Sequence, residues 1–134
     1  MNQADRSFDV VVVDGTPGGI AAALAAARLG RSVTLIEYHD HIGGMTASGL
    51  GKSDVEKRDL IGGMFREFTT RVRRFYCERY GENSENARLC QDGYYAEPSV
   101  AEGIFEELIA EQPGINVLRG RRLTSAKTNQ QLLK

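Results

Sequence analysis

The stretch FDVVVVDGTPGGIAAALAAARLGRSVTLIE, Phe8 to Glu37, decides the fold of this chain. It opens with Phe8–Val13, a short apolar run with four consecutive valines, which predicts a strand buried on both faces of a parallel sheet. The Ala-rich segment Gly18–Leu29 predicts a helix, and Gly30 stands where a C-terminal cap belongs. Arg31–Glu37 is apolar and β-branched and predicts a second strand, so the stretch forms a β-α-β unit.

Downstream of this unit, hydrophobic spacing predicts two more helices, each introduced by a Ser-x-x-Glu capping box. The first box precedes a long apolar stripe that ends at about Arg79, and the second precedes a shorter stripe ended by Pro113. The boxes are Ser53 with Glu56 and Ser99 with Glu102.

The remaining segments complete an α/β pattern. Residues 38–52 and 83–95 are glycine-rich or polar and are expected to be loops, and Ile115–Arg119 is expected to be a third strand. We therefore expect a Rossmann-like three-layer domain over residues 1–134, with parallel strands in the order 3-2-1 and a dinucleotide crossing their carboxyl ends.

Composition excludes several classes of protein. The 134 residues carry 17 Lys and Arg against 18 Asp and Glu, and this near-neutral balance argues against a nucleic-acid or membrane partner. Neither a leader pattern nor a membrane-spanning stretch is present, so we expect a soluble, cytoplasmic chain. Cys77 and Cys90 fit neither zinc nor redox spacing and are expected to be reduced structural thiols.

The glycine-rich turn at residues 14–19, DGTPGG, carries the functional signal. Between a strand and a helix, such a turn aims the first helical amides at a pyrophosphate, and Gly19 allows the helix and strand to pack closely. Glu37, at the end of the second strand, is expected to accept ribose hydroxyls and to repel a 2′-phosphate, with little effect on fold stability. The alternative is a plain glycine turn with an ordinary surface glutamate.

These motifs resemble the FAD-dependent oxidoreductases of the glutathione-reductase-like group, in the branch with GGTPGG and a later IGGM-x3-GLG stretch. The likeness continues through IGGMFREF, EPSVAEGIFEELIAE and INVLRGRRL, over nearly the whole chain. Residues at the places of the family's extended signature are Gly19, Ala23, Gly30, Val33, Glu37, Gly43 and Gly44.

The resemblance implies FAD as the cofactor and places the Gly43–Thr46 loop over its pyrophosphate and ribityl part. It also implies that thiol-disulfide chemistry is absent, because no cysteine pair follows this loop. The expected cofactor-binding residues are Gly15, Thr16, Pro17, Gly18, Gly19, Glu37, Gly43, Gly44, Met45, Thr46 and Leu123.

Asp14 departs from the family pattern, since it occupies the place of the first glycine. Its charge would repel a pyrophosphate by about 1 to 4 kcal/mol at a separation of about 4 Å. Alternatively, its side chain points away and caps the following turn. His39 and His41 have two interpretations: they take part in a metal site or a covalent flavin link, or they are ordinary histidines of a polar loop.

The expected function is that of the FAD-binding part of an oxidoreductase acting on an unknown small molecule, with no catalytic residue identifiable. The family continues well beyond this length, so we expect an N-terminal fragment, active if complemented by the missing half and prone to self-association. The alternative is a truncated, non-catalytic nucleotide-binding module or gene remnant.

Overall fold

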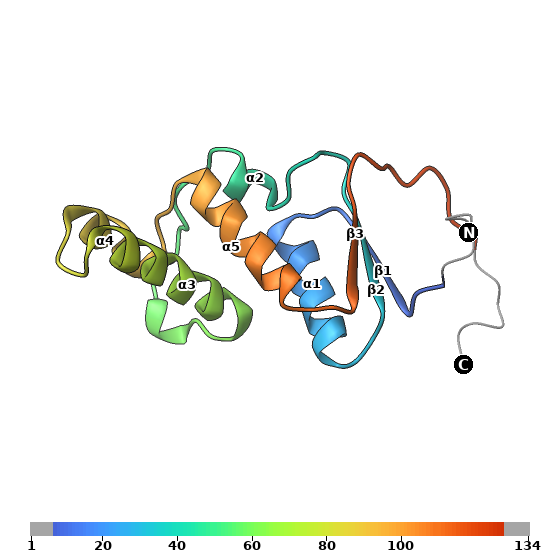
Figure 1. Ribbon diagram of the computed structural model, residues 1–134, viewed down its shortest axis with the longest axis horizontal. Helices are drawn as coiled ribbons and strands as arrows, with labels where there is room; N and C mark the ends of the chain where they lie inside the picture. Colours follow the sequence, from blue (N-terminus) through green and yellow to red (C-terminus); the bar gives the residue numbers. More distant parts are fainter. Residues whose placement is uncertain (1–6, 128–134) are drawn as a thin grey trace.

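The computed structural model describes residues 7–127, in which helices pack against one side of a small sheet (Figure 1). In chain order the elements are β1 (Val10–Val13), α1 (Pro17–Arg28), β2 (Val33–Ile36), α2 (Gly44–Ala47), η2 (Arg58–Leu60), α3 (Gly63–Tyr80), α4 (Glu85–Leu89), η3 (Gln91–Gly93), α5 (Pro98–Ala110) and β3 (Ile115–Leu118).

The three strands are parallel, with β2 in the centre between β1 and β3. Val33 of β2 pairs with Val10 on one side and with Ile115 on the other. This is the predicted order 3-2-1 read from the opposite edge, so the strand order and the initial β-α-β unit are confirmed. The carboxyl ends of all three strands consequently meet at one edge of the sheet, where ligands of such folds bind.

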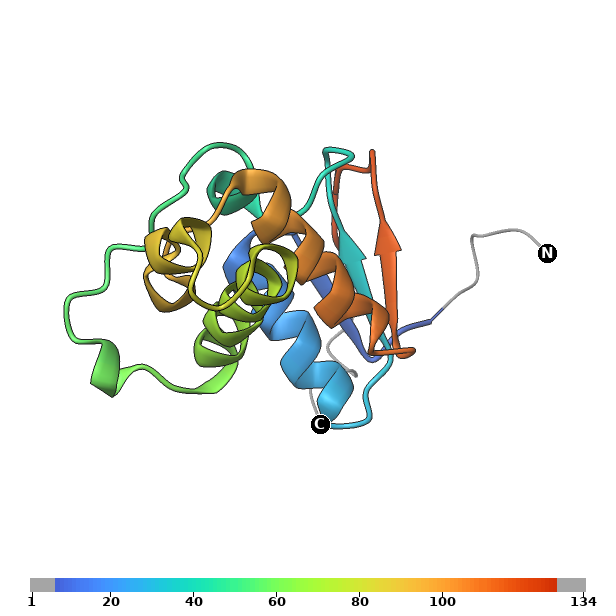
Figure 2. The same cartoon turned by 60° about the vertical axis from the view of Figure 1, so that its left-hand side comes forward.

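Helices α1 and α5 cover one face of the sheet, and α3 packs outside them (Figures 1 and 2). The core lies between these layers, with Leu35 of β2 and Ile20 of α1 almost fully buried. Val72 of α3 and Ile104 of α5 close it from the other side. The Rossmann-like parallel sheet with packed helices is therefore confirmed.

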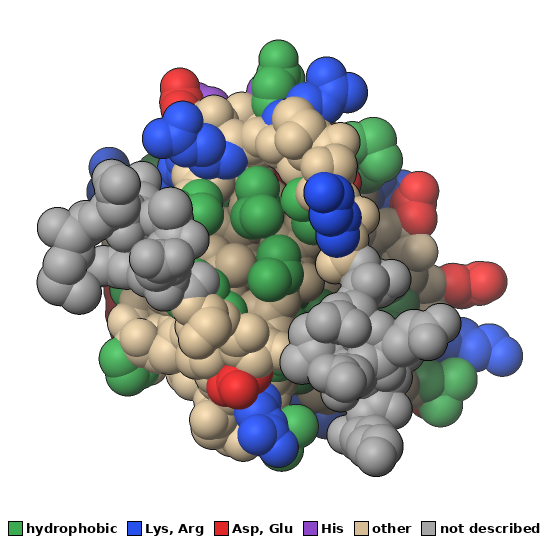
Figure 3. Space-filling model, turned by 90° about the vertical axis from the view of Figure 1, so that its right-hand side faces the viewer, with side chains coloured by type: hydrophobic (Ala, Val, Ile, Leu, Met, Phe, Trp, Pro, Cys, Tyr) green, Lys and Arg blue, Asp and Glu red, His purple; other side chains and the backbone are tan. Residues whose placement is uncertain are grey.

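The opposite face of the sheet carries exposed apolar side chains, gathered at its centre in Figure 3. Val11 and Val13 are 54% and 43% exposed. The prediction that β1 is buried on both faces is wrong, because within residues 7–127 no helix packs on this side. The third layer of the expected arrangement is accordingly not formed by the described residues.

Both predicted capping boxes are wrong. Ser53 lies outside any helix or strand, where its amide donates to the Tyr94 carbonyl at 2.9 Å, and α3 begins only at Gly63, after the N-cap Gly62. In α5 the N-cap is Glu97, because Pro98 takes the first helical position, for which its fixed backbone angle and missing N–H are suited.

Two segments predicted as loops contain helices: 38–52 contains α2, and 83–95 contains α4 and η3. Ser84 caps α4 by accepting the Ala87 amide at 3.1 Å, a local signal that the polar composition obscured. Cys77 and Cys90 are free thiols, as predicted. Among residues 7–127, no helix has the length and apolar character needed to cross a membrane.

Candidate cofactor-binding site

The turn between β1 and α1 has the predicted strand–turn–helix geometry. Thr16 is the N-cap of α1: its Oγ1 accepts the Gly19 amide at 3.3 Å and its carbonyl accepts the Ile20 amide at 2.8 Å. A Cβ on Gly19 would overlap the Asp14 carbonyl oxygen, so close packing of helix and strand requires glycine there. The Gly18 amide, in contrast, has no acceptor within residues 7–127 and remains available to an anion.

Asp14 occupies a strained position in this turn. Its φ of +75° lies in the left-handed region, which explains why glycine suits the place, and its amide donates to the Ile36 carbonyl at 2.9 Å. The side chain is exposed and lines the cleft described below. The alternative in which Asp14 caps the turn does not hold, because Thr16 is the cap.

Glu37 is buried, only 7% exposed, and joins the turn to the end of β2. Its Oε2 accepts the Gly15 amide at 2.7 Å and its Oε1 accepts the His39 amide at 2.8 Å. The carboxylate therefore holds two backbone segments together, a structural role that the sequence did not suggest. A Cβ on Gly15 would lie 2.9 Å from Oε2, so this contact also depends on glycine.

The Gly43–Thr46 loop lies against the turn, as expected of a shared site. The Gly43 amide donates to the Gly15 carbonyl at 2.6 Å. Gly43 has a φ of +105°, and a Cβ there would lie 2.8 Å from the Phe105 ring. An added Cβ on Gly44 would lie 3.4 Å from Thr16 Cγ2, which shows how closely the loop approaches the N-terminus of α1.

These segments surround a cleft of about 730 Å³ at the carboxyl ends of the strands. Of the predicted residues, Thr16, Glu37, Gly44 and Leu123 line it. Gly15, Gly18 and Gly19 build the turn at its edge, and Met45 is 74% exposed beside it. Pro17 and Thr46 line a neighbouring cavity. The full lining is Val13, Asp14, Thr16, Glu37, Tyr38, His39, His41, Gly44, Ser48, Arg121, Arg122 and Leu123.

Sequence reasoning missed three cleft residues that follow β2 and β3 in the chain: Tyr38, Arg121 and Arg122. The Arg122 guanidinium lies 5.7 Å from the centre of the Tyr38 ring, and the Arg121 amide donates to the Glu37 carbonyl at 3.0 Å. Their positions could have been inferred, because the carboxyl ends of neighbouring parallel strands share one edge. The two arginines place positive charge in a cleft that also holds Asp14 and Glu37.

The two histidines also line the cleft. His41 Nδ1 lies 2.8 Å from Glu102 Oε1, and the His39 ring meets the Tyr38 ring edge to face. Within residues 7–127, no group of three or more His, Cys, Asp or Glu side chains is arranged to hold a metal ion.

Comparison with known proteins identifies relatives that match parts of the chain. It is 37% identical over 81 residues to N,N-dimethylglycine/sarcosine dehydrogenase of Chromohalobacter salexigens, covering 60% of this chain and 11% of that protein. It is 45% identical over 40 residues to the soluble pyridine nucleotide transhydrogenase of Mycobacterium tuberculosis, covering 30% of this chain and 8% of that protein. The chain thus spans about a tenth of the length of these curated relatives.

Among solved structures, histamine dehydrogenase from Rhizobium sp. 4-9 aligns with 92% of this chain and 13% of its own, at 20% identity and a TM-score of 0.46. The family model described as FAD dependent oxidoreductase matches residues 9–134. The chain therefore belongs to the FAD dependent oxidoreductase family, with FAD as its cofactor.

Proposed function

We propose that the turn at residues 14–19, Glu37 and the Gly43–Gly44 loop hold the adenosine diphosphate half of FAD. The observation that carries this proposal is the set of contacts that gathers the three segments around one cleft. Gly15 stands at their centre, since its amide donates to Glu37 and its carbonyl accepts the Gly43 amide. The segments thus form one site at the carboxyl edge of the sheet.

The residues present fit this half of the cofactor. The free Gly18 amide and the positive end of the α1 dipole suit a pyrophosphate. A carboxylate offers about four acceptor positions, and the Gly15 and His39 amides use two of those on Glu37, which leaves acceptors for ribose hydroxyls. The same charge disfavours a 2′-phosphate, so the site selects an unphosphorylated adenosine.

The bound flavin supplies the redox chemistry, and this chain binds and orients it. We further propose that residues 1–134 act as the N-terminal FAD-binding domain of a longer, cytoplasmic oxidoreductase whose other parts contact a small-molecule substrate. The short match to each curated relative supports this division.

A Gly→Ala pair tests the binding site. A Cβ on Gly18 would have only Thr16 Oγ1 within 4.0 Å, so the fold accommodates Gly18→Ala, while the methyl group obstructs an approaching phosphate. Gly103→Ala is the matched control, because Gly103 lies inside α5 with open space around its Cβ position. Both changes should raise helix stability by up to about 1 kcal/mol.

Titration of the purified chain with FAD, followed by flavin fluorescence, should give a Kd about tenfold higher for Gly18→Ala than for the parent. Gly103→Ala should leave the Kd unchanged. A parent chain that does not bind FAD, or equal affinities for Gly18→Ala and the parent, would overturn the assigned phosphate site.

A further inference from the structure

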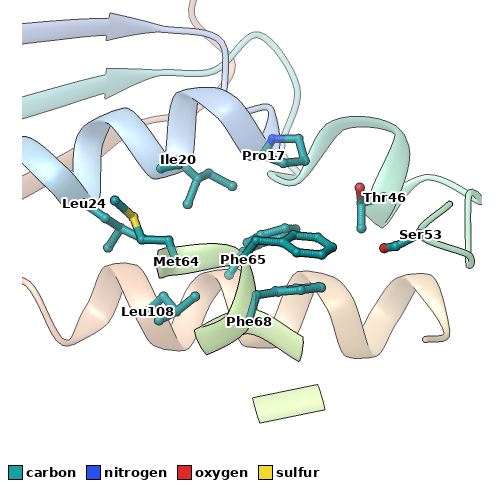
Figure 4. Close-up of a pocket in the computed structure, with 11 residues that line it drawn as sticks. Pro17, Ile20, Leu24, Thr46, Ser53, Met64, Phe65, Phe68 and Leu108 are labelled. Atoms are coloured by element: carbon teal, nitrogen blue, oxygen red, sulfur yellow. The ribbon is translucent and has the colours of Figure 1, made fainter. Parts of the chain in front are cut away.

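A second cavity, of about 110 Å³, lies between α1, α3 and α5 and opens beside α2 (Figure 4). It has no lining residue in common with the cofactor cleft, although the two are separated only by the N-terminus of α1 and the loop carrying α2. Most of its lining is formed by apolar side chains of α1, α3 and α5, and two hydroxyl-bearing residues, Thr46 and Ser53, complete it.

The walls of this cavity are apolar and aromatic. Phe65 and Phe68 project from α3, and the Phe68 ring stacks on the Phe105 ring of α5 with centroids 4.7 Å apart and planes 17° apart. Leu24 and Met64 lie together toward one end (Figure 4). Such a surface is poorly hydrated, and an aromatic ring can extend the existing stack.

The opposite end of the cavity carries two hydroxyl groups. Figure 4 shows Thr46 and Ser53 close to each other, away from Leu24 and Met64. The Ser53 backbone is held by its hydrogen bond to the Tyr94 carbonyl, at 2.9 Å, which leaves the side chain at the cavity. A hydroxyl both donates and accepts, so these two groups match a single polar substituent on an otherwise apolar ligand.

We propose that this cavity is a binding site for a monocyclic aromatic molecule with one hydroxyl group, of the size and chemistry of phenol. The volume limits the ligand to a single ring, since an apolar cavity of about 150 Å³ takes up benzene and this one, of about 110 Å³, is smaller but open at its mouth. The stacked phenylalanines select the ring, and Thr46 and Ser53 select the hydroxyl. This cavity shares no lining residue with the cofactor cleft, although Pro17 and Thr46 were both expected to bind the cofactor.

The NMR signals of the methionine methyl groups report directly on whether phenol binds in the cavity. Met64 lines the cavity, whereas Met45 is 74% exposed on the cofactor loop and serves as an internal control. In the chain labelled with ¹³C-methyl methionine, phenol should shift the Met64 resonance saturably, with a Kd of about 1 mM or tighter, and leave Met45 unmoved. Absence of a saturable Met64 shift at 10-fold this concentration, roughly 10 mM, or an equal response of Met45, would overturn the proposal.

Two variants on α1 test whether phenol binds in this cavity. Ala21→Leu fills the cavity and should raise the Kd for phenol at least tenfold. Ala22→Leu makes the same change at the exposed neighbouring position and should bind phenol as the parent does. Far-UV circular dichroism shows whether both variants are folded, and folded Ala21→Leu that binds phenol normally would contradict the assigned site.

Ser53→Ala supplies a second test that does not alter the apolar walls. It should weaken phenol by about threefold or more and leave benzene binding unchanged, because only phenol uses the hydroxyl. Equal effects on both ligands would refute the role of the polar end.

Discussion

Replacing Asp14 by glycine should tighten FAD binding, because the structure places a carboxylate at the cofactor cleft beside the N-terminus of α1. A unit charge about 4 Å from a phosphate costs about 1 kcal/mol in bulk water and about 4 kcal/mol near a protein surface. Asp14 is exposed, which favours the lower part of this range. We therefore expect Asp14→Gly to lower the Kd for FAD about tenfold.

The same substitution relieves backbone strain. A φ of +75° costs an ordinary L-residue about 1 to 2 kcal/mol, and aspartate tolerates it better than most. Glycine removes that cost but loses about 0.4 to 1 kcal/mol through the greater freedom of its unfolded chain. The free energy of unfolding should therefore change by less than about 1 kcal/mol, so altered affinity would not reflect altered folding.

Asp14→Asn is the matched control, because asparagine keeps the side-chain size and tolerates positive φ but carries no charge. Isothermal titration calorimetry with FAD in about 0.05 M and 1 M salt measures the electrostatic contribution to the binding free energy, because high salt screens that contribution. If charge is the cause, both variants tighten FAD at low salt and approach the parent at high salt. Parent-like affinity of both variants at low salt would refute the reasoning, since the carboxylate would then not oppose the phosphates.

Three further predictions concern stability. Phe68→Ala should lower the free energy of unfolding by about 3 to 5 kcal/mol in urea, because this ring is 5% exposed; an unchanged midpoint would contradict that packing. The hydrogen bond from Arg28 holds the pKa of Glu67 below its ordinary value of 4.5, so its stabilisation is present above that pH and is lost on acidification. Glu67→Gln should flatten this decline in acid titrations of stability. Glu37→Ala should weaken FAD and also destabilise the fold by about 1.5 to 3 kcal/mol in a urea titration; full stability would refute its structural role.

The β-α-β unit could be predicted from sequence because its signals are local. A run of valines, an alanine-rich segment and a glycine cap each specify their own backbone conformation. Burial could not be predicted in the same way: Val11 and Val13 have the composition of buried strand residues, but their exposure depends on which other elements pack there. The first capping box failed for a similar reason, since tertiary contacts at Ser53 outweigh a local pattern. The second failed for a local reason, because Pro98 takes the first helical position.

In the candidate site, residue types indicated the chemistry but not the contacts. Glu37 was predicted as a ribose ligand from its place at the end of β2. Its bonds to the Gly15 and His39 amides depend on how the turn and the loop after β2 come together in space. A carboxylate that organises the site as well as facing its ligand couples fold stability to cofactor affinity, so variants of Glu37 require both measurements.

Residues 43–46 were predicted from sequence as one cofactor-binding loop, but in the structure this segment contributes to two different cavities. Gly44 and Thr46 belong to the helical turn α2, in which successive residues rotate by about 100° around the axis. Residues two positions apart therefore point in nearly opposite directions, about 200° around the helix. Gly44 faces the cofactor cleft and Thr46 the apolar cavity, so substitutions at these positions separate the two proposed sites within a single turn.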